Sequence, residues 1–303
     1  MASTSLPHFA FGVIADVQYA DVEDGYNFTR TSLRYYRTAL QMLGQAVDSW
    51  NTDKLVCPQF VLQLGDAIDG KNKHIKMSDT ALHTVLNEFS KFKGNVFHIW
   101  GNHEYYNFTR QELLNSGLNS GREHFSIPVC GKTYYSAIPH PKVRILALDC
   151  YEISKLASPK DSSEYALACE YMRNNGNEDQ NSCEGLTGVC KRFVQYNGAL
   201  GERQIQWMKN NLQEAEFMQQ NVIIIGMAIK KKLFWNDVCI FLIFHPSKSM
   251  TEGLLQNYCY YLINQVFNEN WVIVMLKSAA GVNFWFPLNN YPGVCDQGQG
   301  HCD

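Results

Sequence analysis

The sequence predicts an α/β protein built on a parallel sheet, because strand and helix patterns alternate along its first hundred residues. Buried-strand patterns cover residues 8–15, 60–65 and 95–100, and stretches with helical periodicity lie between them at 31–50 and 77–92. Strands that alternate with helices form parallel sheets with right-handed crossovers. At 303 residues and 46% hydrophobic composition, the chain is long enough to bury a sizeable core.

The same type of pattern continues as far as residue 226. Thr109 stands three positions before Glu112, a capping box that predicts a short helix over 109–118. Residues 155–190 are polar and rich in Gly and Asn, which predicts a long surface insertion. The remaining predicted elements are strands at 133–138, 144–149 and 221–226 and an amphipathic helix at 201–216.

Composition narrows the classes of partner. A net charge of -3 gives no basic field for nucleic acid or an anionic membrane, so a small-molecule substrate is favoured. The N-terminal residues lack the basic region of a signal peptide, and the apolar runs at 239–244 and 271–276 are too short to cross a bilayer. The ten cysteines include no Cys-x-x-Cys pair. We expect a cytoplasmic monomer with reduced thiols.

Three consecutive strand patterns end in side chains that bind metals. These are Asp16 and Gln18, then Asp66 and Asp69, then Asn102, His103 and Glu104. Asp16 and Gln18 are two apart, so the strand period predicts that they share one face. The carboxyl ends of parallel strands meet at one edge, where α/β proteins bind ligands. One polar strand end is ordinary turn chemistry, but three in a row indicate a metal site. Two ions about 3.5–4 Å apart at such a site activate water for in-line attack on phosphorus.

The motifs D-x-Q, G-D-x-x-D and G-N-H-E resemble those of the calcineurin-like metallophosphoesterase family. Gln18 stands where that family usually has a histidine, and this feature is similar to one branch, the manganese-dependent ADP-ribose/CDP-alcohol diphosphatases. The segments "NSGREHFSIP", "ALDCYEIS" and "YNGALGERQIQWM" also resemble that branch. The resemblance covers residues 8–225. It implies a four-layer β-sandwich flanked by helices and a hydrolase that cleaves the phosphoanhydride of ADP-ribose, CDP-choline and related compounds to monophosphates.

The resemblance also implies a set of metal ligands. Asp16 and Gln18 correspond to ligands of the first ion, Asp66 to the ligand that bridges both ions, and Asn102 to a ligand of the second. The implied cofactors are two divalent ions, with Mn²⁺ first in expectation and Zn²⁺, Fe²⁺ or Mg²⁺ as alternatives.

Other residues of the motifs take supporting positions in the resemblance. His103 corresponds to the residue beside the phosphate that donates a hydrogen bond or a proton to the leaving oxygen, for which we expect a near-neutral pKa. Asp69 and Glu104 are expected to orient the ligands and to tune His103. Arg122 and His124 are the residues we would test for substrate contact, although an Arg in a polar turn is usually only solvated.

The sequence departs from the family after residue 226. Met227 stands where the family has a histidine, and the later Gly-His-x-His motif is absent. His245 and His301 lie beyond Met227 without the flanking pattern of a family ligand. We therefore divide the chain into a metallophosphoesterase-like domain at 1–225 and a divergent segment at 226–303. An alternative transcript end or an error in the gene model is the favoured explanation of that segment, ahead of a divergent working lobe. The sandwich is expected to lack its C-terminal strands.

Two hypotheses of function follow. The first is a metal-dependent diphosphatase. The second is a catalytically inactive product that lacks the C-terminal histidine ligands and is misfolded or acts only by binding. An unrelated Rossmann-type nucleotide binder is disfavoured, because no Gly-x-Gly-x-x-Gly follows the first strand.

Overall fold

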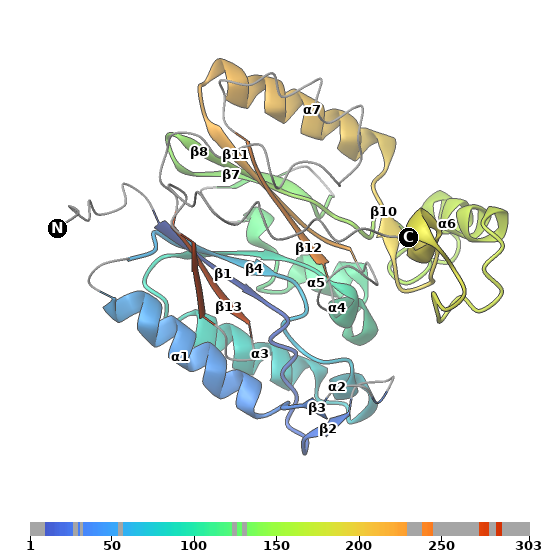
Figure 1. Ribbon diagram of the computed structural model, residues 1–303, viewed down its shortest axis with the longest axis horizontal. Coiled ribbons are helices and arrows are strands. Elements are labelled where there is room, and N and C mark those ends of the chain that lie inside the picture. Colours follow the sequence, from blue (N-terminus) through green and yellow to red (C-terminus); the bar gives the residue numbers. More distant parts are fainter. Residues whose placement is uncertain are drawn as a thin grey trace, which may run out of the picture.

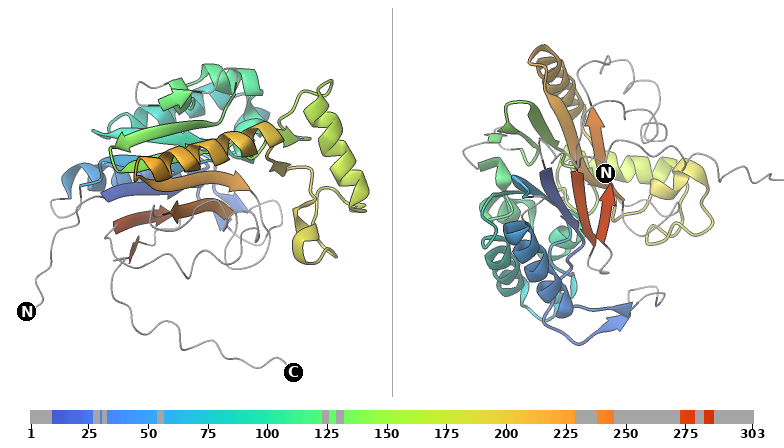
Figure 2. Two further views of the ribbon diagram at one scale, coloured as in Figure 1. Left: turned by 90° about the horizontal axis from the view of Figure 1, so that it is seen from above. Right: turned by 60° about the vertical axis from the view of Figure 1, so that its left-hand side comes forward.

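Two five-stranded sheets pack face to face, and helices cover their outer faces (Figure 1). The computed structural model describes residues 10–26, 30, 33–53, 57–122, 126–128, 132–228, 238–244, 273–278 and 283–286. The strand order is β14-β13-β1-β4-β5 in the first sheet and β12-β11-β8-β7-β6 in the second. Figure 2 shows the two sheets from two further directions, with α7 outside the second sheet. The predicted α/β class and its layered sandwich are confirmed.

The elements have the following bounds. The first sheet consists of β1 (Ala10–Ala15), β4 (Phe60–Leu64), β5 (Asn95–Ile99), β13 (Ile273–Ser278) and β14 (Asn283–Phe286). The second consists of β6 (Ser126–Pro128), β7 (Tyr135–His140), β8 (Val143–Ala147), β11 (Asn221–Ala228) and β12 (Val238–Phe244). The helices are α1 (Thr38–Thr52), α2 (Lys71–His74), α3 (Ser78–Phe89), α4 (Asn102–Asn107), α5 (Arg110–Asn115), α6 (Ser163–Asn174) and α7 (Glu202–Phe217). Smaller elements are β2 (Gly25–Tyr26), β3 (Leu33–Arg34), β9 (Ile153–Ser154), β10 (Gly198–Ala199) and the 3₁₀ turns η1 (Ser120–Arg122) and η2 (Gly188–Arg192).

Strand direction determines where the polar strand ends meet. β1 runs parallel to β4, and β4 runs parallel to β5, so all three strands finish at the same edge of the first sheet. In the second sheet β8 and β11 are also parallel. The turns that follow β1, β4 and β5 are therefore neighbours, as the sequence predicts.

The space between the sheets is filled by alternate residues of each strand. In β4, Phe60, Leu62 and Leu64 belong to the inner core, whereas Val61 packs on the outer side. Every second side chain of a strand points to the same face, so a strand that is covered on both faces is largely apolar. All five residues of β4 are buried, and only Gln63 among them is polar.

Helices cover both outer faces. In α1, Leu43, Val47 and Trp50 pack against the first sheet, and the Trp50 ring lies directly over the backbone of Gly12 in β1. A side-chain carbon at Gly12 would lie 3.0 Å from Trp50 Cε2, so the close approach of helix and strand requires glycine there. On the other side, α7 packs on β8 and β11.

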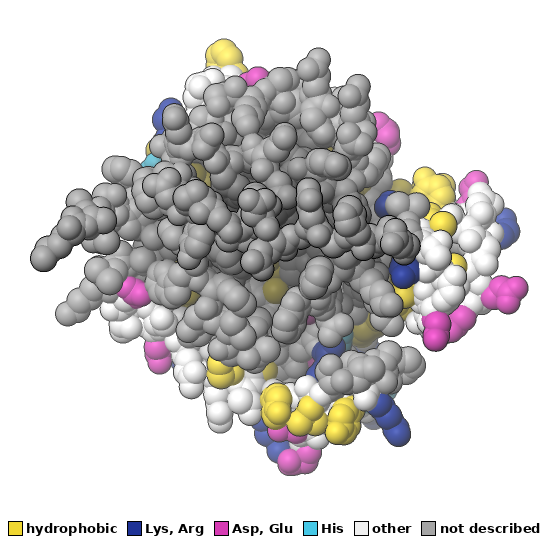
Figure 3. All heavy atoms as spheres, viewed as in Figure 1, with side chains coloured by type: hydrophobic (Ala, Val, Ile, Leu, Met, Phe, Trp, Pro, Cys, Tyr) yellow, Lys and Arg dark blue, Asp and Glu magenta, His cyan; other side chains and the backbone are white. Residues whose placement is uncertain are grey.

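The start of the first predicted helix differs from the structure. The helix predicted from residue 31 begins at Thr38, because Leu33 and Arg34 instead pair with Gly25 and Tyr26 as the small β2–β3 ribbon. Tyr26, Leu33 and Tyr35 are among the most exposed large apolar side chains there, and Figure 3 shows hydrophobic side chains gathered at that lower edge. Helix periodicity does not reveal a two-residue strand pair.

The region at 155–190 contains more structure than its composition predicts. Ser162 caps α6 by accepting a hydrogen bond from the backbone N–H of Tyr165, and Ala168, Met172 and Cys183 are buried. Figure 1 shows α6 projecting to one side of the sandwich. The segment is therefore a small helical lobe, held by a short apolar core, and not an irregular loop.

Strands from beyond residue 226 complete both sheets. β12 pairs with β11, and β13 pairs in parallel with β1, from Ala10 opposite Ile273 to Ala15 opposite Ser278. The expectation that the sandwich lacks its C-terminal strands is therefore wrong. Apolar runs that are too short for a membrane form β12 at the edge of one sheet and β13 inside the other. In the described ranges, no helix is long and apolar enough to span a membrane.

His98 of β5 belongs to the core. Its Nδ1 atom lies 3.2 Å from Gln63 Oε1, and its ring meets Phe89 edge-on at 5.3 Å. Gln63 donates through Nε2 to the carbonyl oxygen of Gly65 at 2.8 Å, so its oxygen faces His98 and the His98 Nδ1–H donates. Burial lowers the pKa of His98 to about 4.

The free energy of unfolding is expected to fall as the pH drops from about 6.5, the ordinary histidine pKa, toward 4. In this window the unfolded chain takes up a proton at His98 and the folded chain does not, so acid favours unfolding. Urea denaturation at several pH values should show a shallower dependence for His98→Asn. His83→Asn, at an exposed position of α3, is the matched control and should keep the wild-type slope. Equal slopes for His98→Asn and the wild type would contradict the assignment.

Candidate metal centre

Turns after β1 and β4 bring the first predicted ligands together. The backbone N–H of Gln18 donates to the carbonyl oxygen of Asp66 at 2.9 Å, and that of Asp16 donates to Gly65 at 3.3 Å. The Gln18 amide donates through Nε2 to Asp16 Oδ1 at 3.0 Å and to Asp66 Oδ2 at 3.3 Å. Asp16, Gln18 and Asp66 therefore form one cluster, as the sequence predicts.

The backbone of these three residues lies in the left-handed region. The φ angles are 53° for Asp16, 46° for Gln18 and 54° for Asp66. For residues other than glycine this conformation costs roughly 1–2 kcal/mol each. The side chains of Asp16 and Gln18 meet because of this left-handed turn. The explanation predicted from the sequence, that the two-residue period of a strand puts them on one face, is wrong, because β1 ends at Ala15. Strain of this kind concentrates at ligand sites, where the surrounding structure enforces it.

Asn102 contributes an unsatisfied oxygen. Its side chain is only 5% exposed, and its Oδ1 accepts no hydrogen bond from any residue in the described part of the chain. The next backbone N–H, that of His103, donates to Asp66 Oδ1 at 2.9 Å and so places Asn102 beside the bridging candidate. A buried acceptor without a donor is costly unless a ligand fills the gap.

Glu104 joins the two turns that carry these residues. Its carboxylate accepts backbone N–H groups from Gly101 at 2.7 Å, Asp66 at 2.8 Å and Ala67 at 2.7 Å. Glu104 is fully buried, and burial raises its pKa although the three donors oppose the shift. The single side chain of Glu104 thus fixes the turn after β4 against the start of α4. This is a geometry suited to the supporting position that the sequence predicts for Glu104.

His103 is held through its Nδ1 atom. The backbone N–H of Gly70 donates to His103 Nδ1 at 3.0 Å, and Asp69 Oδ2 lies 3.4 Å from the same atom. Because Nδ1 accepts, the neutral ring carries its proton on Nε2. Burial lowers the pKa of His103 to about 4, with Asp69 opposing and Arg34 adding to the shift. The pKa of the buried His103 ring is therefore lower than the near-neutral value expected from the sequence.

Arg34 was not singled out by any sequence motif. It lies in β3, and its Nη1 atom approaches Asp69 Oδ2 at 3.7 Å. Only the β2–β3 ribbon, which has no periodic signal, brings it to this edge. Arg122 is exposed in η1 and donates to Asn115 Oδ1 at 3.0 Å, which is the solvated position typical of an Arg in a polar turn. His124 lies outside the described residues, as do His245 and His301.

Met227 approaches the site from the opposite sheet. It is the last inward-facing residue of β11 among those described, following Ile223 and Ile225 by the strand period. A side-chain carbon at Gly65 would lie 2.5 Å from the Met227 sulfur, and one at Gly101 would collide with that sulfur and with Asp66 Oδ1. The two glycines are thus required by the close approach of Met227, as well as by the turns themselves.

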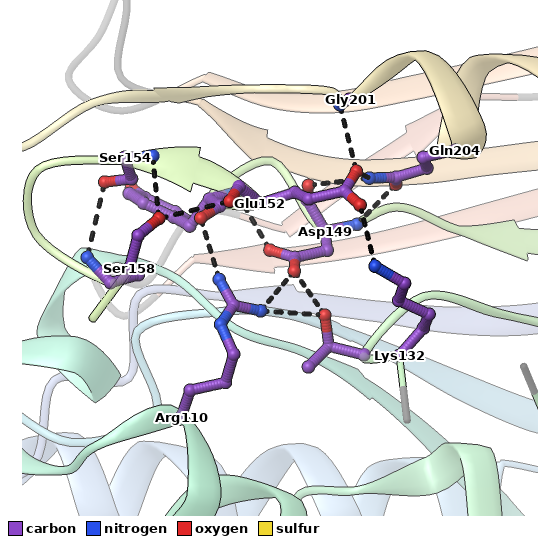
Figure 4. A network of polar contacts seen from close by, with 11 residues as sticks. Arg110, Lys132, Asp149, Glu152, Ser154, Ser158, Gly201 and Gln204 are labelled. Carbon is purple, nitrogen blue, oxygen red and sulfur yellow. Dashed lines mark hydrogen bonds and ion pairs between the residues drawn. The ribbon is translucent and has the colours of Figure 1, made fainter. Parts of the chain in front are cut away.

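A partly buried ion pair lies beyond this site. Arg110, at the start of α5, pairs with Asp149 and donates through Nη2 to the carbonyl oxygen of Tyr151 at 2.7 Å (Figure 4). Burial is the largest single influence and lowers the pKa of Arg110, but the charge and hydrogen bond of Asp149, together with Tyr105 and Glu152, outweigh it, and the net shift is upward. Gln204 of α7 accepts from the Asp149 backbone N–H at 2.9 Å. The network joins the α4–α5 region to the second sheet and to α7.

The donor set fits hard divalent ions. Two carboxylates (Asp16, Asp66) and two amides (Gln18, Asn102) offer oxygen ligands, the kind preferred by Mn²⁺ and Mg²⁺. Within the described ranges no three His, Cys, Asp or Glu side chains converge as a metal cluster, so the amides are essential to any ion held here. The unsatisfied oxygen of Asn102 is the observation that supports this fit.

Comparison with known proteins agrees with this geometry. The family model described as "Calcineurin-like phosphoesterase" matches residues 9–274. The chain belongs to the calcineurin-like phosphoesterase family. The match reaches β12 and the start of β13, which is further than residue 226, where the sequence motifs end. Members of this family are hydrolases, and this phosphoesterase shares their fold.

Several relatives are similar over most of this phosphoesterase. A mouse protein named manganese-dependent ADP-ribose/CDP-alcohol diphosphatase is 40% identical over 233 residues, which cover 74% of this chain and 68% of the mouse protein. An Arabidopsis thaliana protein of the same name is 38% identical over 255 residues, covering 80% and 78%. The crystal structure of a dimetal phosphatase from Danio rerio has a TM-score of 0.65 at 38% identity, covering 73% of this chain and 69% of that one.

Glu104→Gln is expected to lower the free energy of unfolding by about 1–3 kcal/mol, because an amide offers one acceptor oxygen to three buried N–H donors. Glu112→Gln is the matched control. Glu112 takes the same position in α5, but it is exposed there, and its loss should cost less than about 1 kcal/mol. Chemical denaturation measures both, and equal effects would contradict the assigned role of Glu104.

Proposed function

We propose that this phosphoesterase is a manganese-dependent diphosphatase that cleaves the phosphoanhydride of ADP-ribose, CDP-choline and related nucleotide-diphosphate compounds to two monophosphates. The observation that carries the proposal is the convergence of Asp16, Gln18, Asp66 and Asn102 at one sheet edge. The names and identities of the relatives support the choice of substrate.

Each candidate ligand has a distinct position in the proposed site. Asp16 and Gln18 would hold one divalent ion, Asn102 would hold a second, and Asp66, which lies between them in the hydrogen-bond network, would bridge both. Two bound ions supply an activated water and neutralise charge on the phosphoryl oxygens. Glu104 keeps the turns after β4 and β5 at a fixed separation, so the ligands are preorganised.

His103 would act on the substrate through Nε2. The Gly70 N–H occupies Nδ1, so Nε2 carries the proton and can donate it in a hydrogen bond to an oxygen of the diphosphate. Asp69 and Gly70 fix the ring from the other side, and the Tyr106 ring contacts it at 5.3 Å. The residue that the sequence predicts as the acid or donor is thus held in the tautomer that a donor needs.

The presence of Met227 in place of a histidine favours the second hypothesis, that the chain is catalytically inactive. A thioether is a soft, neutral group and a poor substitute for an imidazole as a ligand of Mn²⁺. Its sulfur fills the space between Gly65 and Gly101, next to Asp66. Position 227 therefore supplies no nitrogen ligand to the proposed metal site. We expect weak metal binding and low turnover as a consequence.

Asp66→Ala is expected to abolish Mn²⁺-dependent release of AMP from ADP-ribose, by more than about 100-fold, since loss of even a supporting residue costs 10–100-fold. The rise in melting temperature on addition of Mn²⁺ should disappear as well. Asp161→Ala, at an exposed position near α6, should leave both measurements unchanged. If the wild-type chain shows neither turnover nor a metal-induced rise in melting temperature, the second hypothesis holds and the first is overturned.

Met227→His is expected to raise the affinity for Mn²⁺ at least about tenfold, a change of the size that site residues exert on metal affinity. The inward position of Met227 beside Asp66 directs the new imidazole toward the same ligands. Isothermal titration with Mn²⁺ measures the effect. Met218→His, at a position that is 52% exposed, is the control and should bind as the wild type does. An unchanged affinity in Met227→His would show that Met227 does not limit metal binding.

A further inference from the structure

The Nδ1 atom of His103 lies between a donor and an acceptor that compete for it. The Gly70 N–H donates to Nδ1 at 3.0 Å, and the Asp69 carboxylate lies 3.4 Å from the same atom. Nδ1 can accept from Gly70 only when it carries no proton, and it can donate to Asp69 only when it carries one. The neutral ring has a single N–H, so this competition determines whether Nε2 is a donor or an acceptor.

The peptide group between Asp69 and Gly70 carries the N–H that decides the competition. Its other polar atom is the Asp69 carbonyl oxygen. That oxygen accepts from the Asn72 N–H at 3.2 Å, from the Asn72 amide at 2.9 Å and from the Asn107 amide at 3.1 Å. A trans peptide group is planar, and its C=O and N–H point in opposite directions. The donors that fix the Asp69 carbonyl oxygen therefore also aim the Gly70 N–H at His103.

Asn107 connects this peptide group to the backbone of His103. It is the last residue of α4, and it is 1% exposed. Besides its bond to Asp69, the amide nitrogen of Asn107 donates to the His103 carbonyl oxygen at 2.8 Å. The Asn107 Oδ1 atom accepts from Ser78 Oγ, at the start of α3, at 2.7 Å. The oxygen and both hydrogens of the amide thus have partners, which fixes its orientation.

The bond from Asn107 to Asp69 does more than satisfy a buried carbonyl oxygen. Such an oxygen has two lone pairs, and Asn72 alone supplies two donors. Asn107 adds a link, because one side chain holds both the backbone of His103 and the peptide group that binds the His103 ring. Hydrogen bonds at this depth are strong, since water does not compete with them.

We propose that Asn107 is a positioning residue, which keeps the proton of His103 on Nε2 by fixing the peptide group between Asp69 and Gly70. The inference rests on the proposed function for the use of that proton, a hydrogen bond to the diphosphate. Without Asn107 the peptide group is free to turn away, and the Asp69 carboxylate then attracts an N–H at Nδ1. The ring would carry its proton on the wrong nitrogen, and Nε2 could not donate.

Asn107→Leu tests the proposal, because leucine has the same branched shape and no donor. Long-range ¹H–¹⁵N correlation spectra show which ring nitrogen carries the proton. They are recorded on the whole chain without metal, at about pH 8, where imidazole is neutral. The His103 signals are those absent from His103→Gln. The Nε2–H form should dominate in the wild type, and its ratio to the Nδ1–H form should fall at least about tenfold in Asn107→Leu, the effect of one hydrogen bond.

Asn211→Leu is the matched control. Asn211 of α7 is 9% exposed, and its amide donates to the carbonyl oxygen four positions back, that of Trp207, at 3.0 Å. Asn107 makes the same contact with His103. Asn211→Leu should lower the melting temperature, as Asn107→Leu does, but it should leave the His103 ratio within about twofold of the wild type, because the sites are independent.

A milder variant decides the matter if Asn107→Leu does not fold. Ser78→Ala removes only the hydroxyl that holds the Asn107 oxygen. It should lower the His103 ratio in the same direction by at least about twofold, because the amide of Asn107 is then less firmly oriented. An unchanged ratio in Ser78→Ala would in that case overturn the proposal.

Turnover provides a second readout that a purely structural role would not produce. In Asn107→Leu, kcat for ADP-ribose with Mn²⁺ should fall about 10- to 100-fold, and KM should change by less than about threefold, because the Nε2 hydrogen bond matters most in the transition state. In a His103→Gln background the same substitution should lower kcat by less than about twofold, since Asn107 acts through His103.

The outcomes separate this inference from the proposed function. If the His103 ratio falls in Asn107→Leu and the wild type does not hydrolyse ADP-ribose, the positioning role stands and the proposed function fails. An unchanged ratio in a folded Asn107→Leu, or an equal change in Asn211→Leu, overturns the inference whatever the turnover. Equal losses of kcat in the wild-type and His103→Gln backgrounds also overturn it, because Asn107 would then serve the fold alone.

Discussion

The candidate site depends on one buried carboxylate. Glu104 receives three backbone N–H groups from two turns that are more than thirty positions apart in the sequence, and these turns carry Asp66 and Asn102. Charge-assisted bonds to a group that water does not reach are short and directional. They hold Asp66 in a left-handed conformation that it would otherwise leave. The hydrogen bonds of Glu104 thus stabilise the strained backbone conformation of Asp66, which would be unfavourable without them.

The second sheet supplies the other wall of the site. Alternation along β11 turns Met227 inward, where its sulfur fits over Gly65 and Gly101. The turn after β8, which carries Asp149, follows the strand that pairs with β11. The ion pair of Arg110 and Asp149 connects that turn to the helices that follow β5. A change in the separation of the sheets would therefore alter the surroundings of Asp66, even if every residue of the first sheet kept its place.

Much of this arrangement could be predicted from the sequence, and the rest could not for physical reasons. Short apolar runs predict β1, β4, β5 and β11, and the polar residues after the first three predict the cluster around Asp66. The pattern of apolar and polar residues does not determine the backbone conformation of single residues. The sequence therefore does not predict the left-handed turn at Gln18. The position of Arg34 depends on the two-residue β2–β3 ribbon, which has no periodic signal. The strands beyond residue 226 lie where family motifs are absent, although their apolar composition suits a sheet.

The place of β13 has a consequence for how the protein folds during synthesis. β1 leaves the ribosome long before β13, one of its two neighbours in the sheet, since Ala10 lies opposite Ile273. Until β13 emerges, that edge of β1 lacks its native partner, and exposed edges invite pairing with other chains. Such long-range closure slows folding more than it lowers stability, because the entropy of loop closure grows only slowly with length. The nascent chain is therefore expected to need a chaperone that shields the edge of β1 until β13 has been synthesised.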